Sequence, residues 1–133
     1  MLDSILSLKS GNTLIVGAFG AGKTMLINSL HPSSHIVLDS FESLHLAPNT
    51  IHGILGSGIA VITVLSLARL GPSISDLLDH VSNFVFFRVS NTEDAEIAAS
   101  ISKLAPTAFL NLPDLSAIVC DRTGNIESLI VEP

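Results

Sequence analysis

The sequence predicts an α/β fold of three layers, with a mainly parallel sheet, helices on both of its faces and a β-hairpin at the C-terminal end. Short apolar runs of strand-forming residues alternate with helical segments along the chain, and such alternation produces parallel sheets that helices cover. A length of 133 residues suits a single domain over residues 1–133. Hydrophobic residues make up 47% of the chain, which is enough to fill one core. No repeat, linker or low-complexity tract divides the chain.

The first strand, residues 13–16, leads into the segment GAFGAGKT at residues 17–24, which has the P-loop pattern G-x-x-x-x-G-K-[ST]. Glycines let such a loop close around phosphate groups, and successive main-chain N–H groups then point toward the anion. A helix over residues 24–30 follows, and Pro32 ends it because the residue before a proline avoids helical geometry. Strand, loop and helix together predict an ATP or ADP site. Its expected residues are Gly17, Ala18, Phe19, Gly20, Ala21, Gly22, Lys23 and Thr24, with Lys23 at the β- and γ-phosphates and Thr24 on Mg²⁺.

A candidate metal ligand closes the second strand, residues 36–39. We expect this apolar strand to be buried next to the P-loop strand, so that the carboxylate of Asp39 holds Mg²⁺. The alternative is an ordinary acid in a strand-end turn, or a helix cap. Ser40 follows directly, so the base that activates water would have to be Glu42. Glu42 either rotates into the site or faces solvent, and the sequence leaves both open.

The remaining elements continue the alternation. We expect a loop at 47–49, a brief helix at 51–55 broken by glycines, and a strand at 60–65. A turn at 71–73, a helix at 75–81, a strand at 84–89 and a helix at 93–104 follow, then a hairpin of strands 117–120 and 126–131. The helix at 93–104 has two alternative capping pairs, Ser90 with Glu93 and Asn91 with Asp94, and Pro106 stops it.

The composition of the chain limits which binding partners and which cellular compartment are expected. A formal charge of −6 with six Lys and Arg residues leaves a monomer without the basic surface that nucleic acid requires. The apolar run 54–70 is shorter than a membrane span, contains glycines and ends near Arg69, so it reads as a buried strand and no membrane contact is expected. Cys120 is the single cysteine, which fits a reducing, cytoplasmic compartment. The three arginines, Arg69, Arg88 and Arg122, are too few for the lid of a nucleotide kinase.

The order of the motifs resembles the FtsK–HerA branch of P-loop ATPases, the additional-strand type with RecA-like cores. The resemblance rests on LIVGAFGAGKT (14–24), IVLDSFESL (36–44), GIAVITVLSLARLGPSI (58–74), FFRVSNTEDAEI (86–97) and the ending LPDLSAIVCDRTGNIESLIVEP. It implies a Mg²⁺-dependent ATPase that forms a homo-oligomeric ring, receives an arginine from a neighbouring subunit, and moves DNA or protein as a translocase or packaging subunit.

The chain also departs from the family pattern. Only about ten residues separate the P-loop helix from Asp39, so a strand is missing, and the chain resembles a reduced member. Ser40 stands in place of the usual catalytic glutamate and Ser66 in place of the usual glutamine. We therefore expect low intrinsic hydrolysis, with Lys23 and Glu42 as the catalytic candidates. The alternative function is a degenerate nucleotide-binding switch or assembly module that hydrolyses little.

Overall fold

The computed structural model describes residues 11–18, 20–28, 36–39, 41, 47–71 and 73–131. The strands of these residues form one sheet in the order β2-β3-β1-β4-β5-β6. The four parallel strands are β1 (Asn12–Val16), β2 (Ile36–Leu38), β3 (Ala60–Val64) and β4 (Val81–Phe86). The antiparallel hairpin of β5 (Ser116–Asp121) and β6 (Ile126–Ile130) extends the sheet beyond β4. This architecture confirms the predicted fold class.

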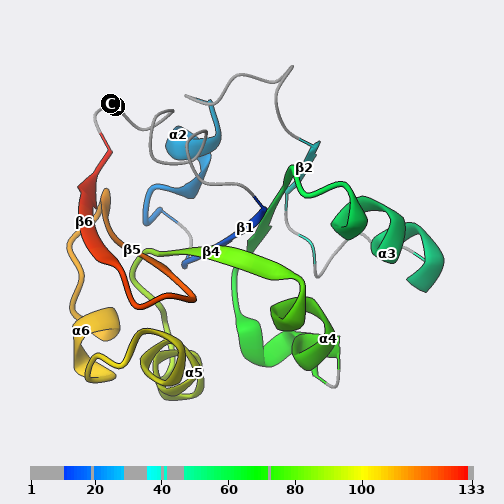
Figure 1. The fold of residues 1–133 in the computed structure, drawn as a ribbon. Helices are drawn as coiled ribbons and strands as arrows, with labels where there is room; N and C mark the ends of the chain where they lie inside the picture. Colours follow the sequence, from blue (N-terminus) through cyan, green and yellow to red (C-terminus); the bar gives the residue numbers. More distant parts are fainter. Residues whose placement is uncertain are drawn as a thin grey trace.

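Helices cover both faces of the sheet, as predicted. The helical elements are α2 (Lys23–Asn28), α3 (Pro48–Gly56), the 3₁₀ helix η2 (Leu67–Leu70), α4 (Ser73–Asp79), α5 (Thr92–Ser102) and α6 (Thr107–Leu110). Figure 1 shows α2 on one side of the sheet, with α4, α5 and α6 on the other. Leu26 of α2 packs with Ile15 and Phe87, whereas Phe109 of α6 packs with the opposite face around Phe86. Because helices cover both faces, β1 and β3 are buried at every position.

The placement of β2 corrects one prediction. The strand carrying Asp39 is not buried next to the P-loop strand: β3 pairs with β1, and β2 pairs with β3 at the edge of the sheet. Ile36 and Val37 are each 36% exposed. A run of three apolar residues has the same pattern at an edge as at the centre of a sheet, so the sequence could not distinguish these positions.

Several predicted element boundaries were also wrong. The loop expected at 47–49 is the first turn of α3, because Pro48 occupies the start of the helix, where no N–H partner is needed, and Gly53 does not interrupt it. The strand expected at 84–89 is β4, which begins at Val81, and α4 ends at Asp79. Neither η2 nor α6 was predicted.

The cap of α5 settles the two alternatives that the sequence left open. The side chain of Asn91 accepts a hydrogen bond from the N–H of Asp94 at 2.8 Å, so Asn91 and Asp94 form the capping pair. The helix ends at Ser102, and Lys103 follows in the left-handed conformation, with φ of 69°. None of the helices in the described ranges combines the length and the apolar character needed to cross a membrane.

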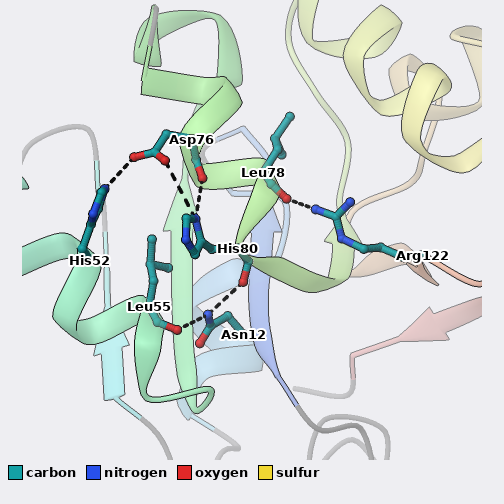
Figure 2. A network of polar contacts seen from close by, with 7 residues as sticks. All are labelled: Asn12, His52, Leu55, Asp76, Leu78, His80 and Arg122. Atoms are coloured by element: carbon teal, nitrogen blue, oxygen red, sulfur yellow. Dashed lines mark hydrogen bonds and ion pairs between the residues drawn. The ribbon is translucent and has the colours of Figure 1, made fainter.

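A buried asparagine, Asn12, joins four elements at the amino end of β1, and Figure 2 shows its bonds to Leu55 and His80. The Nδ2 group of Asn12 donates to the carbonyl of Leu55 at 2.7 Å and to that of His80 at 2.9 Å. Its Oδ1 atom accepts from the N–H of Ala60 at 3.0 Å, and the residue is 3% exposed. Asn12 thereby fixes the end of α3, the start of β3 and the turn before β4 against β1.

The turn of the C-terminal hairpin is organised by one carboxylate. Asp121 Oδ1 accepts hydrogen bonds from the hydroxyl of Thr123 at 2.6 Å and from the N–H groups of Thr123 and Asn125. These bonds, the Thr123 hydroxyl first among them, hold the pKa of Asp121 well below its usual range. The carboxylate therefore stays ionised, and keeps accepting these hydrogen bonds, at a more acidic pH than an ordinary aspartate would.

Candidate nucleotide-binding site

The P-loop follows β1 at the carboxyl end of the parallel strands. Its first part is fastened on both sides: the N–H of Gly17 donates to the carbonyl of Val64 at 3.2 Å, and that of Ala18 donates to the carbonyl of Arg88 at 2.9 Å. The N–H of Ala21 donates to the carbonyl of Ala18 at 3.3 Å, which closes a turn within the loop. The ends of β3 and β4 therefore fix the shape of the loop that the motif predicts.

Two glycines of the loop are required by close packing against Phe87. A Cβ on Gly17 would lie 2.7 Å from the Cβ of Phe87, and one on Gly22 would lie 2.9 Å from the ring of the same residue. Gly22 also has a φ of 123°, a backbone conformation that side-chain-bearing residues rarely adopt. The sequence pattern explains these glycines by phosphate binding, and the structure adds that the loop lies directly on the core.

The ammonium group of Lys23, the lysine of the P-loop motif, places a positive charge at the loop. Lys23 is the first residue of α2, and its Nζ donates to the carbonyl of Gly17 and, at 3.2 Å, to that of Ala18. These contacts fold the side chain back over the loop. The ammonium group thus lies over the loop, where a bound phosphate would need a counter-charge.

A cavity of about 340 Å³ lies at this end of the sheet and brings Asp39 together with four residues of the predicted loop, whereas Gly17, Ala18 and Ala21 do not line it. It is lined by Gly20, Gly22, Lys23, Thr24, Met25, Asp39, Leu65 and Leu115. Thr24 is exposed on α2, and Asp39 is exposed directly after β2. Two residues predicted from separate motifs therefore contribute to one wall, although β3 separates their strands.

The carboxylate of Asp39 is oriented by a neighbouring strand. Asp39 Oδ1 accepts a hydrogen bond from the hydroxyl of Thr63, which is buried in β3, at 2.6 Å. Because β3 lies between β1 and β2, this bond connects the edge strand to the centre of the site. Sequence analysis did not identify Thr63, since its hydroxyl could equally have served the backbone of its own strand.

The donors available suit Mg²⁺ bound together with a nucleotide. No cluster of three His, Cys, Asp or Glu residues that could hold a metal by itself occurs among the described residues. Mg²⁺ does not need one, because it takes hard oxygen ligands from one or two protein groups and completes its shell with phosphate oxygens and water. The hydroxyl of Thr24 and the carboxylate of Asp39 are such groups, and both line the cavity.

A second cavity of about 340 Å³ adjoins the first at Leu65. It is lined by Ala18, Leu65, Ser66, Arg69, Ser90 and Asn91. The short helix η2, which carries Arg69, is held in place by the buried carboxylate of Asp94, which accepts from the N–H of Ala68 at 2.9 Å. Ser66 and Arg69 therefore lie on a supported segment beside the P-loop.

The other two arginines have structural roles. Arg88 pairs with Asp114 at 2.5 Å and donates to the carbonyl of Leu112 at 3.3 Å. Arg122 donates to the carbonyls of Val81 and Leu78 and lies 5.8 Å from the centre of the Phe84 ring. Arg69, the third arginine, lines the second cavity next to the loop.

Two residues of the predicted site, Phe19 and Glu42, lie outside the described residues, as does Ser40. The structure adds Met25, Leu65 and Leu115 to the cavity wall. Met25 follows the motif directly and could have been found by extending it. Leu115 carries no signal in the sequence, because the antiparallel strand β5 brings it to this end of the sheet.

The fold, with the loop at the end of β1, has the architecture of a P-loop NTPase core. No family model matches the sequence, and no curated protein matches it significantly. The genome packaging NTPase B204 from Sulfolobus turreted icosahedral virus 2, solved with AMP, has a similar structure: the TM-score is 0.68 at 10% identity, over 92% of this chain and 98% of B204. The plasmid coupling protein TrwB, solved with the GTP analogue GDPNP, gives a TM-score of 0.60 at 19% identity over 80% of this chain. TrwB with the ATP analogue ADPNP gives 0.59 at 21% identity.

The structural similarity covers a different fraction of TrwB than of B204. The chain spans about a third of TrwB, 34% in the GDPNP complex, but nearly all of B204. At such identities the comparisons show the fold. They confirm at that level the resemblance to the FtsK–HerA branch that the order of the motifs indicated.

Proposed function

We propose that this domain binds ATP or ADP together with Mg²⁺ at the P-loop. The observation that carries the proposal is that Gly20, Gly22, Lys23, Thr24 and Asp39 line one and the same cavity. The similar structures of B204 and TrwB, solved with AMP, ATP-γS and analogues of GTP and ATP, support it.

Each residue has a distinct part in this binding. Main-chain N–H groups of Gly20 and of residues 22–24 would surround the phosphates, and the Lys23 ammonium group would neutralise their charge. Thr24 and Asp39 hold the cation, and Thr63 keeps the Asp39 carboxylate turned to one position. Bound Mg²⁺ would supply further charge neutralisation at the β- and γ-phosphates.

Asp39→Asn tests the metal part of the proposal. Asparagine can still accept the hydrogen bond from Thr63, so we expect the fold to be retained, while the neutral amide binds Mg²⁺ poorly. The increase in ATP affinity that Mg²⁺ produces should fall by about tenfold, as measured by titration calorimetry with Mg²⁺ and with EDTA. Asp76→Asn, which changes an exposed carboxylate on α4, is the matched control and should leave the Mg²⁺ effect unchanged. An equal Mg²⁺ effect in Asp39→Asn and wild type would remove Asp39 from the metal site.

We further propose that the isolated domain hydrolyses ATP slowly. Serine at position 40 cannot accept the proton of the attacking water near neutral pH, so positioning and charge stabilisation alone would support a residual rate. Glu42 is the remaining candidate base. Glu42→Gln should abolish the residual release of phosphate and leave ATP affinity unchanged. Fast turnover in wild type, unaffected by Glu42→Gln, would show that the catalytic group lies elsewhere.

The resemblance to the FtsK–HerA branch supports a further proposal, that the protein acts as a homo-oligomeric translocase or packaging subunit. Arg69 is the arginine best placed to act across a subunit boundary, since Arg88 and Arg122 are engaged within the domain. With a formal charge of −6, contact with DNA would require an assembled ring or a local patch. The alternative proposal, favoured by Ser40, is a nucleotide-dependent switch or assembly module without useful turnover.

A further inference from the structure

Leu115 has a backbone conformation that its side chain disfavours. Its φ is 66°, in the left-handed region, and Lys103 at 69° is the other described non-glycine residue with a positive φ. A leucine in this region is unusual, because its Cβ crowds the main chain. Residues held in such conformations persist where surrounding contacts fix them, and they gather at binding sites.

Main-chain hydrogen bonds on three sides hold Leu115 in this conformation. It is the third residue of a turn closed by the bond from the N–H of Ser116 to the carbonyl of Pro113, at 3.2 Å. A positive φ in such a turn normally selects glycine. The N–H of Leu115 donates to the carbonyl of Ala21 in the P-loop at 2.9 Å, and its carbonyl accepts from the N–H of Val131 at 2.8 Å. The turn thus keeps a leucine where local preference would place a glycine.

The side chain of Leu115 lines the nucleotide cavity on the side away from the metal ligands. Asp39 follows β2, two strands from β1 in one direction, and Leu115 precedes β5, two strands from β1 in the other. The wall therefore has a polar end at Asp39 and an apolar end at Leu115. An aliphatic side chain offers no hydrogen bond to phosphate, but it can pack against a ribose or the face of a base.

We infer that Leu115 contacts the nucleoside part of the bound nucleotide, and that its strained conformation directs the side chain to that contact. The inference rests on the proposed function, because it assigns a residue to the same site. It differs from a purely structural role, in which Leu115 would only cover Phe87 and Ala21 in the core beneath the loop.

The test compares ATP with inorganic tripolyphosphate, both with Mg²⁺, by titration calorimetry. Leu115→Gly keeps the left-handed backbone without strain and removes the side chain. It should weaken ATP binding about tenfold, leave tripolyphosphate binding unchanged, and lower Tm less than Leu115→Ala does, because both variants lose the packing on the core but only glycine relieves the strain. Leu115→Ala should weaken ATP equally, with a lower Tm, because it keeps the strain. Lys103→Gly is the matched control: it relieves the same strain at the end of α5, so it should raise Tm and leave ATP affinity unchanged.

Each other outcome overturns the inference in a recognisable way. Equal ATP affinity in wild type and Leu115→Gly would show that the side chain does not contact the ligand, with nucleotide binding itself intact. A parallel loss of ATP and tripolyphosphate would show that Leu115 acts only by shaping the P-loop. A wild-type protein that binds neither ligand would overturn the proposed function, and this inference with it.

Discussion

Lys23→Ala is expected to weaken binding of ATP with Mg²⁺ by roughly 10- to 100-fold, the largest effect of any single change in the cavity. The lysine supplies a charge-assisted contact, and hydrogen bonds to charged groups contribute about 1.5–3 kcal/mol. Titration calorimetry of ATP and ADP gives the two affinities. The loss should be greater for ATP, because its additional phosphate increases the charge that the ammonium group neutralises.

Two further variants separate charge from structure at this position. Lys23→Arg keeps the charge, but its planar, bulkier group cannot occupy the same place over Gly17 and Ala18, so binding should recover only in part. Lys103→Gly removes a charge at the end of α5 and should leave affinity unchanged. If Lys23→Ala bound ATP as tightly as wild type while remaining folded, the P-loop would not be the nucleotide site.

Asn12→Ala is expected to destabilise the domain by about 3 kcal/mol. The change removes a hydrogen-bond partner from the carbonyls of Leu55 and His80 and from the N–H of Ala60. The bonds to Leu55 and Ala60 are buried, and a buried polar group that loses its partner costs about 1–3 kcal/mol. Urea unfolding, followed by circular dichroism, measures the loss. Asn12→Asp should be at least as damaging at neutral pH, because it replaces the donor with a buried carboxylate facing two carbonyl oxygens.

The control for Asn12 is an asparagine outside the network. Asn49 is exposed in the first turn of α3, and Asn49→Ala should change the free energy of unfolding by less than about 0.5 kcal/mol. A loss in Asn12→Ala no larger than in Asn49→Ala would mean that the three hydrogen bonds of Asn12 contribute nothing net to stability.

The features that could be predicted from the sequence are those whose residues follow one another in the chain. The P-loop could be located because strand, glycines, lysine and helix follow one another, and each has a local reason. The strand order could not be predicted in the same way, since β3 enters between β1 and β2 from a later part of the chain. Asp39 still reached the cavity wall, because parallel strands end at the same side of a sheet whatever their order.

The features that the sequence missed depend on long-range contacts. Phe87 requires glycine at both Gly17 and Gly22, but nothing near the P-loop motif indicates that a phenylalanine lies beneath it. Leu115 reaches the site only because β5 runs antiparallel to β4. Asn12 lies at the start of an apolar strand, and its role became visible only once α3, β3 and β4 were placed around it.

The hydrogen bonds of Leu115 also have a mechanical consequence. Two consecutive main-chain bonds, from Val131 to Leu115 and from Leu115 to Ala21, connect the residue that follows β6 to the P-loop. A load applied at the end of β6 would therefore be transmitted to the P-loop through these two bonds. The edge strand β6 is thus mechanically coupled to the P-loop, and tension on β6 would shift the positions of Lys23 and Thr24 in the cavity wall.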